Sequence, residues 1–516
     1  MNIGIDIGSF YIKSSGYIGS EHPDVLFNYQ TKRITHGFVS IKNMTNRNTF
    51  RFDDINERNL ENLRIEIGES AFENTLKRSD TGTGYFSLFL GNNNEKNEDL
   101  ASQLLVKHFN PEIRRNLLRS FISQYIHQVS PSPVQKEITI SVPADFTIPQ
   151  RNELLSCFSS LGHVSVRVID DIDSVIALYI SEKLEILNGE TKNVMFIDVG
   201  ATSMKCYLVQ FSSTNGKIDM KRLSYDSKYG NGGSFLTSRI AEAIISKMKI
   251  KDKGIDLKRR ILPYAEKFKH TLTLLQSTTQ TIEVDDNEYI VTFTRDEMNV
   301  LAKPLCDELR VLISNCKKAK QIEIIELFGG ASRSVIIQEY VQKLFKLQKI
   351  GHKLNPDESI SLGCCYYSKI FKDNETTNTM SIQDMAYPNS IDLKFNGKTM
   401  IICERGKVCK EKIKIHEPTN CLSFLYKTHA YKTPSNNHTV CFRTQTTIPF
   451  EIIQTSFGFI YESDEFAQNT NHMKVVTNYE YSIHYKEIVE NEFRKQNEAR
   501  LEYEKIHNHQ DLSPLS

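Results

Sequence analysis

Two short apolar runs, far apart in the chain, each end in an aspartate that is followed two residues later by a glycine. Asp6 and Gly8 close the first run, and Asp198 and Gly200 close the second. Glycine lets the backbone turn tightly and lets its N–H groups approach an anion, and a nearby aspartate can hold a hydrated Mg²⁺ against that anion. Two such turns facing each other would clasp the phosphates of a nucleotide. Their repetition predicts a duplicated α/β domain.

A third glycine turn lies between a predicted strand, 322–328, and an apolar-periodic segment, 335–347. Gly329 and Gly330 form this turn, and a strand–turn–helix arrangement suits a flat ring or a phosphate beside the turn. A further helix is predicted to begin near Pro356, because proline is favoured at the first helical position and acids follow in the first turn.

Strands and helices must position these turns, and residues 1–372 alternate between the two patterns. Residues 373–385 have the polar composition of a linker. Residues 386–484 carry short runs of period two, which predict an antiparallel β-sandwich. Residues 485–516 predict a short, charged helical tail. The predicted fold class is therefore α/β: a two-lobed nucleotide-binding domain, then an antiparallel β-sandwich and a short C-terminal helix.

Composition indicates a packed globular protein. Of the 516 residues 39% are hydrophobic, and the net charge of +1 argues against a nucleic-acid surface as the main role. The ten cysteines form no CxxC pair, which favours core packing over metal or redox chemistry. No apolar run is long enough to cross a membrane. No signal peptide or retention signal is recognised, so we expect a cytoplasmic protein, with the endoplasmic reticulum lumen as the alternative.

These features resemble the heat shock protein 70 superfamily, whose nucleotide-binding domain has the two-lobed actin and sugar-kinase fold. The resemblance covers roughly residues 1–372 and is weaker beyond them. The matching residues, in chain order, are Gly4–Gly8, Ile140–Pro143, Gln150 and Arg151, Phe196–Gly200, Gly232 and Gly233, Ala265–Lys269, Gly329–Arg333, and Asn355–Glu358. The resemblance implies an actin-like domain that binds ATP or ADP with Mg²⁺, then a linker, a β-sandwich domain that binds peptides, and a helical lid.

The resemblance also implies roles for individual residues. Asp6 and Asp198 match the acids on the metal side of the phosphate turns, and Asp171 and Asp198 match catalytic positions. Glu266 and Lys269 match residues that flank the adenine and ribose. The positions implied to bind the nucleotide are Asp6, Gly8, Ser9, Gly200, Ser203, Lys205, Gly232, Glu266, Lys269, His270, Gly329, Gly330, Arg333 and Asp357.

Four of the positions near the phosphates depart from the family's pattern. Ser87 stands where the family has a lysine near the γ-phosphate, and Lys205 replaces an acid just past the second turn. Asp171 is one methylene shorter than the family's glutamate, and Phe10 replaces a hydroxyl. Because phosphoryl transfer needs neutralised charge and an oriented water, we expect ATP hydrolysis to be weak or lost. Lys205 could pair with a phosphate, or it could be a surface lysine that never reaches the site.

Some features resemble one branch of the superfamily: Phe10, the run 168–172, a linker without leucines and the run 381–393. This branch comprises the heat shock protein 110 and glucose-regulated 170 kilodalton groups, which act mainly as nucleotide-exchange factors and holdases. Three hypotheses follow. The first is an ATP-binding chaperone of that kind, whose partners are a heat shock protein 70 and unfolded polypeptides, with no nucleic acid or membrane. The second is a foldase that hydrolyses ATP. The third is a metabolic kinase or filament protein of the actin fold, against which the β-rich region after the linker argues.

Overall fold

The computed structural model describes most of the chain between Asn2 and Glu462. The described residues are 2–19, 21–43, 63–77, 81–84, 100–105, 111–131, 136–146, 148–158, 161, 164–183, 190–214, 217–250, 254–284, 287–317, 322–346, 354–377, 380–385, 390–404, 406–407, 412–415, 419–427, 437–446, 450–455 and 458–462. Ser87 and the predicted tail helix of 485–516 lie outside these residues.

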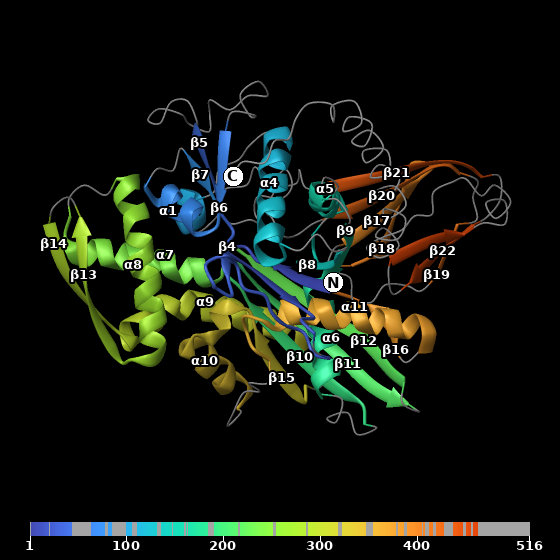
Figure 1. Ribbon diagram of the computed structural model, residues 1–516. Coiled ribbons are helices and arrows are strands. Elements are labelled where there is room, and N and C mark those ends of the chain that lie inside the picture. Colours follow the sequence, from blue (N-terminus) through green and yellow to red (C-terminus); the bar gives the residue numbers. More distant parts are fainter. Residues whose placement is uncertain are drawn as a thin grey trace, which may run out of the picture.

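The first lobe is built on a sheet that contains the first Asp-x-Gly turn (Figure 1). Its central strand, β1, pairs antiparallel with β2 and parallel with β8. The strands run in the order β3-β2-β1-β8-β9, with β4 also pairing with β2. Their bounds are β1 Asn2–Ile7, β2 Tyr11–Gly16, β3 Asp24–Val25, β4 Thr35–His36, β8 Lys136–Val142 and β9 Val164–Asp170.

The second lobe repeats this arrangement around the second turn. Strand β10 pairs antiparallel with β11 and parallel with β15, as β1 does with β2 and β8. The order is β15-β10-β11-β12-β16. The bounds are β10 Lys192–Val199, β11 Ser203–Thr214, β12 Lys217–Tyr229, β15 Ile324–Phe328 and β16 Met380–Met385. The actin-like, duplicated α/β architecture predicted for this part of the chain is therefore confirmed.

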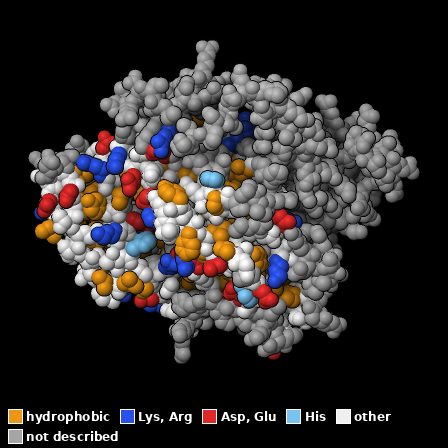
Figure 2. All heavy atoms as spheres, viewed as in Figure 1, with side chains coloured by type: hydrophobic (Ala, Val, Ile, Leu, Met, Phe, Trp, Pro, Cys, Tyr) orange, Lys and Arg blue, Asp and Glu red, His pale blue; other side chains and the backbone are white. Residues whose placement is uncertain are grey.

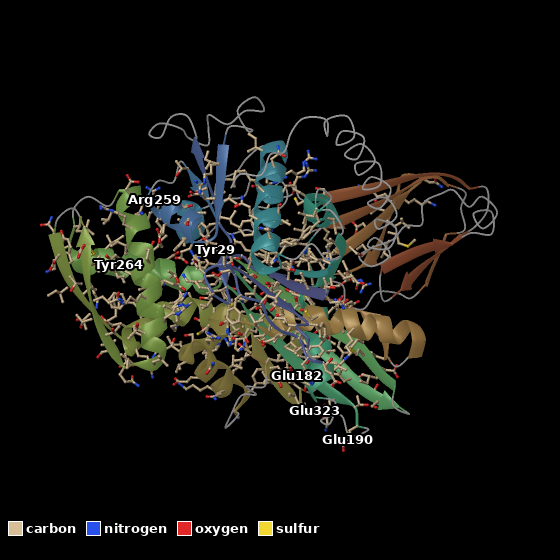
Figure 3. The ribbon with its side chains drawn as sticks, in the orientation of Figure 1. Tyr29, Glu182, Glu190, Arg259, Tyr264 and Glu323 are labelled. Carbon is tan, nitrogen blue, oxygen red and sulfur yellow. The ribbon has the colours of Figure 1, made fainter. Side chains whose placement is uncertain are left out.

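The carboxyl ends of the parallel strands meet at the centre of the molecule, where ligands bind in α/β sheets. Glu190 and Glu323 lie at the opposite end, where β10 and β15 begin (Figure 3). From there the two strands run side by side until Asp198 pairs in register with Phe328. Asp198 and the turn at Gly329 therefore lie next to each other at the carboxyl ends of these strands.

Helices cover the sheets and join them. Helices α6 and α11 pack against each other, and α11 also packs on β1, β2 and β8. A third sheet, β6-β5-β7, and the hairpin β13–β14 complete the outer parts of the lobes. The bounds are α1 Glu69–Lys77, α3 Leu100–Leu105, α4 Pro111–Val129, α5 Ile148–Phe158, α6 Asp171–Lys183, α7 Gly233–Met248, α8 Ile255–Leu274, α9 Arg295–Lys317, α10 Val335–Phe345, α11 Ser359–Thr377, β5 Val39–Asn43, β6 Leu63–Ile67, β7 Gly82–Thr83, β13 Ser277–Val284 and β14 Asn287–Thr294.

Two glycines let α11 lie directly on its neighbours. A Cβ at Gly363 would stand 2.0 Å from the carbonyl oxygen of Ser174 in α6, and a Cβ at Gly4 would stand 2.2 Å from the carbonyl oxygen of Ser361. Both distances are far shorter than a real contact, so only glycine permits this stacking of strand β1 and the two helices.

Beyond α11 the chain becomes β-rich, as the period-two pattern predicts. Part of the expected linker, 380–385, forms β16, which pairs parallel with β12. The strands that follow form two antiparallel sheets, β18-β17-β20-β21 and β19-β22-β23. Their bounds are β17 Ser390–Phe395, β18 Lys398–Cys403, β19 Lys412–Ile415, β20 Thr419–Lys427, β21 Asn437–Thr446, β22 Phe450–Thr455 and β23 Gly458–Glu462. Their packing as a sandwich and the bounds of the four predicted segments stay predictions.

The described surface is mixed in character. Lys, Arg, Asp and Glu side chains are interspersed with apolar ones over the described part of the face in Figure 2. Within the described residues, every helix is too short or too polar to traverse a lipid bilayer.

The α6–α11 contact generates a stability prediction. Gly363→Ala places a methyl group against the α6 backbone, so we expect the free energy of unfolding to fall by about 1–3 kcal/mol through overpacking. Lys369→Ala, at an exposed position of the same helix, is the matched control. Thermal denaturation followed by circular dichroism checks the pair. Equal midpoints for the two variants would contradict the close approach of the helices.

Candidate functional site

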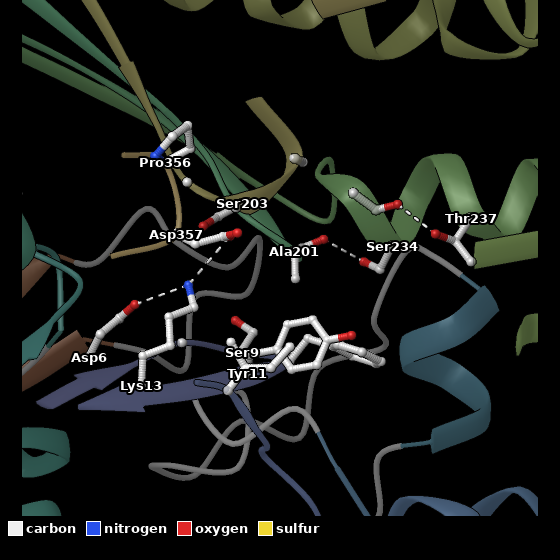
Figure 4. A pocket seen from close by; sticks show the side chains of 18 of the residues that line it. Asp6, Ser9, Tyr11, Lys13, Ala201, Ser203, Ser234, Thr237, Pro356 and Asp357 are labelled. Carbon is white, nitrogen blue, oxygen red and sulfur yellow. Dashed lines mark hydrogen bonds and ion pairs between the residues drawn. The ribbon is translucent and has the colours of Figure 1, made fainter. Parts of the chain in front are cut away.

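One cavity of about 600 Å³ lies between the two lobes, where all three glycine turns meet. Figure 4 shows the β1–β2 turn facing the β10–β11 turn and α7 across it. Nearly all of the residues predicted to bind or act on a nucleotide line this cavity: Asp6, Gly8, Ser9, Asp171, Asp198, Gly200, Ser203, Lys205, Glu266, Lys269, His270, Gly329, Gly330, Arg333 and Asp357. The structure therefore brings the predicted positions together.

Gly232 is the exception, because it lies beside the cavity instead of lining it. It is the N-cap of α7, and a Cβ there would stand 2.5 Å from the carbonyl oxygen of Ala201. Its neighbour Gly233 lines the cavity and donates its N–H to the carbonyl oxygen of Gly200, at 2.9 Å. Gly232 thus holds the second turn against the start of α7.

The first turn is built by the β1–β2 hairpin. A Cβ at Gly8 would stand 2.5 Å from the carbonyl oxygen of Tyr11, so the turn needs a glycine. The Ser9 hydroxyl lies 2.6 Å from the Thr202 hydroxyl of the second turn, which joins the two turns directly. Asp6 is paired across the strands with Lys13, whose Nζ donates to Asp6 Oδ2 at 3.5 Å.

The second turn contains a similar aspartate–lysine pair with a shorter contact. Asp198 lies opposite Lys205 in the β10–β11 register. Lys205 Nζ donates to Asp198 Oδ2 at 2.9 Å and to Asp171 Oδ2 at 2.5 Å, and the Tyr207 hydroxyl donates to Asp171 Oδ1 at 2.8 Å. Lys205 is buried and lines the cavity. The interpretation of Lys205 as a surface lysine that never reaches the site is therefore wrong.

The electrostatics follow from burial and from these pairs. Burial raises the pKa of Asp198 to about 6, although the Lys205 ammonium opposes that rise. Burial also raises the pKa of Asp6, against the charge of Lys13. Burial disfavours the charged form of Lys205, but Asp171 and Asp198 outweigh it, so the pKa of Lys205 is raised and its ammonium stays charged.

A second polar cluster lines the cavity on α8. Lys269 Nζ donates to Glu266 Oε2 at 2.7 Å, and His270 Nε2 lies 2.9 Å from Glu266 Oε1. Thr237 of α7 donates its hydroxyl to the same carboxylate at 2.6 Å. Burial opposes ionisation of Glu266, but Lys269 and His270 outweigh it and lower the pKa of that carboxyl. The predicted places of these residues around an adenosine stay predictions.

The third glycine turn, at Gly329 and Gly330, also lines the cavity. Gly329 has φ +83°, and a Cβ there would stand 2.1 Å from Asp198 Oδ1, so both conformation and space require glycine. Its N–H donates to the carbonyl oxygen of Pro356 at 3.1 Å. Arg333 forms an ion pair with Asp357, and a Cβ at Gly330 would stand 3.2 Å from that carboxylate.

Sequence reasoning missed Lys13. Its signal was available, because Lys13 follows Asp6 by the same seven residues that separate Lys205 from Asp198. Sequence reasoning also treated Phe10 as a lost hydroxyl and did not predict a place for its ring in the cavity wall. The Phe10 ring lies edge-on to Phe72, with 5.6 Å between centroids, and both line the cavity. Phe72 comes from α1, and no spacing in the sequence connects it to the turn.

The residues present fit an anionic ligand better than they fit a free cation. Narrow glycine turns and the cationic side chains of the cavity suit phosphate groups. Asp6 and Asp198, the predicted Mg²⁺ ligands, each already contact a lysine ammonium. Within the described parts of the chain, no group of three or more His, Cys, Asp or Glu side chains is arranged to hold a metal ion.

Comparison with known proteins shows similarity to heat shock proteins and to a hypoxia up-regulated protein. It is 28% identical to Heat shock protein hsp88 of Neurospora crassa over 57% of this chain and 44% of the relative. It is 23% identical to Hypoxia up-regulated protein 1 of Xenopus laevis over 72% of this chain and 61% of the relative. It is 27% identical to Heat shock protein 110 of Caenorhabditis elegans over 52% of this chain and 36% of the relative. The chain thus spans about half the length of the curated relatives it matches.

A family model described as Hsp70 protein matches residues 2–417, which include both lobes and the start of the β-rich region. The relatives bear out the predicted resemblance to the heat shock protein 110 branch. The chain therefore belongs to the heat shock protein 70 family, as a divergent member similar to that branch.

Proposed function

We propose that this protein binds ATP or ADP between its lobes, hydrolyses ATP weakly or not at all, and assists protein folding as a nucleotide-exchange factor or a holdase. The main support for this proposal is Lys205. Its ammonium contacts the carboxylates of both residues predicted to be catalytic, Asp171 and Asp198.

Nucleotide binding is supported by the meeting of three glycine turns in one cavity with cationic side chains. Lys269 and His270 reach it from α8, and Arg333 reaches it from the third turn. Members of the family bind nucleotide, generally with Mg²⁺. The arrangement of Glu266 with Lys269 also suits the hydroxyls of a ribose, because a carboxylate accepts and an ammonium donates.

Weak hydrolysis is supported by what surrounds the first two turns. A carboxylate that already accepts a bond from an ammonium at 2.5 Å, as Asp171 does, is a poor base for an attacking water. The rings of Phe10 and Phe72, which also line the cavity, carry no hydrogen-bonding group that could orient that water.

The proposed partners are a heat shock protein 70 chaperone and unfolded polypeptides, and neither nucleic acid nor a membrane is among them. One relative is named Heat shock protein 110, which agrees with a role beside a chaperone. The proposed location is the cytoplasm, with the endoplasmic reticulum lumen as the alternative. Six cysteines of the described chain are buried free thiols, which suits a reducing compartment.

Exchange activity gives the direct test of the proposal. A heat shock protein 70 loaded with a fluorescent ADP should release it several-fold faster when this protein is added. A foldase would instead turn over ATP faster when an unfolded peptide is added. Unchanged release from the partner, together with peptide-stimulated turnover, would favour the foldase.

Nucleotide binding itself predicts the effect of a variant on α8. Lys269→Met removes a cation from the cavity wall, so we expect ADP affinity to fall roughly tenfold, the value of one charge-assisted hydrogen bond. Lys303→Met is the control, since Lys303 pairs with Asp307 on the exposed side of α9. Calorimetric titration with ADP measures both. Equal affinities would mean that the nucleotide does not lie against α8.

Weak hydrolysis predicts the behaviour of a restored site. In single-turnover assays we expect the wild type to be on the order of a hundredfold slower than Ser87→Lys combined with Lys205→Asp, since such electrostatic groups commonly contribute that much. Ser87→Lys alone separates the two contributions, and ADP binding by each variant shows that its site is intact. If the wild type hydrolyses ATP as fast as the double variant does, weak hydrolysis is refuted and the foldase hypothesis is favoured.

A further inference from the structure

Each lobe carries a buried lysine at the same place in its hairpin. Lys13 lies opposite Asp6 in the β1–β2 register, and Lys205 lies opposite Asp198 in the β10–β11 register. Both lysines are buried, and both line the cavity between the lobes. The duplicated fold has thus placed one ammonium behind each of the two turns that would meet the phosphates.

Each lysine also contacts an acid from outside its own hairpin. Lys205, in the second lobe, donates to Asp171, which directly follows β9 of the first sheet. Lys13, in the first lobe, lies 3.9 Å from Asp357 Oδ1, in the turn that is hydrogen-bonded to Gly329 at the end of β15. Each ammonium group therefore lies between two carboxylates, as a bound cation would. Figure 4 shows this for Lys13, between Asp6 and Asp357.

We propose that Lys13 and Lys205 are built-in cations that replace the divalent cation, so that the cavity binds the phosphates of a nucleoside di- or triphosphate without Mg²⁺. This inference rests on the proposed nucleotide binding and deepens it. Lys13 and Lys205 act toward the ligand as phosphate-binding and positioning residues.

The chemistry of the ammonium group supports this assignment. An ammonium has three N–H donors, and Lys205 directs two of them at the Asp171 and Asp198 carboxylates. The third can reach a phosphate oxygen, which an acid at this position would repel. The Lys13 ammonium also contacts two carboxylates at longer distances, Asp6 at 3.5 Å and Asp357 at 3.9 Å.

Charge explains why a divalent cation is not needed. With every group ionised, Asp6, Asp171 and Asp198 with Lys13 and Lys205 carry a net charge of −1. With an acid in place of Lys205 the same set would carry −3 and would repel phosphates unless a metal ion intervened. The two ammonium groups already neutralise two of the three carboxylate charges, so the attraction of this cluster for Mg²⁺ is reduced.

Calorimetric titration with ADP, in Mg²⁺ and in excess EDTA, tests the proposal. We expect wild-type affinity to change less than about threefold between the two buffers. Lys205→Asp should lose at least about tenfold when EDTA replaces Mg²⁺, because its carboxylates then need a metal ion. Lys13→Met, which removes the weaker ammonium, should lose affinity in EDTA and recover part of it in Mg²⁺. Lys247→Met, at a lysine paired with Glu297 outside the cavity, should behave as the wild type.

The wild-type measurement decides the matter without relying on any variant, and thermal denaturation shows whether each variant is folded. If the wild type binds ADP in Mg²⁺ but not in EDTA, the built-in cations are refuted while the proposed nucleotide site stands. If it binds ADP in neither buffer, the proposed nucleotide site fails and this inference falls with it.

Discussion

A charge buried between the lobes must have a partner, and this constraint organises the centre of the molecule. Lys205 has an ammonium with little access to water, and removing one partner of a buried ion pair typically costs about 3–5 kcal/mol. Its partners come from both sheets, Asp198 from the end of β10 and Asp171 from the residue that follows β9. The start of α6 therefore has to face the β10–β11 hairpin. The shape of the cavity follows from that placement.

Other buried polar contacts repeat this principle along the same junction. Asp170, at the end of β9, accepts from Arg222 of β12 at 3.0 Å and from Arg151 at 2.7 Å. Asp145, just after β8, accepts from the Tyr225 hydroxyl of β12 at 3.0 Å. The contacts from Arg222 and Tyr225 each join an acid at the carboxyl end of a first-lobe strand to a donor on β12 of the second lobe. The lobes are thus held by directional bonds, which fix their relative positions more tightly than apolar packing alone.

The glycine turns and the duplicated α/β pattern could be predicted from the sequence because both are local. A tight turn after a buried strand leaves glycine few substitutes, and the apolar runs before Asp6 and Asp198 show the strands directly. The fate of Lys205 could not be predicted in the same way. It depends on Asp171, which comes from the other lobe, and nothing in the sequence near position 205 encodes that contact. The strand at 380–385 was hidden for a related reason, since a polar segment pairs when a neighbouring edge such as β12 offers its backbone groups.

The contact of Lys205 across the lobes also bears on how nucleotide binding and lobe closure are coupled. A ligand can shift a conformational equilibrium only by the difference in its affinity for the two states. The ion pair between Lys205 and Asp171 already holds the lobes together. Nucleotide binding therefore shifts the equilibrium between open and closed lobes by a smaller amount. Such a domain suits a protein that presents one stable surface to a partner, and it suits less well one that cycles between states with each ATP. The same pairs that weaken the case for hydrolysis therefore favour the exchange factor over the foldase.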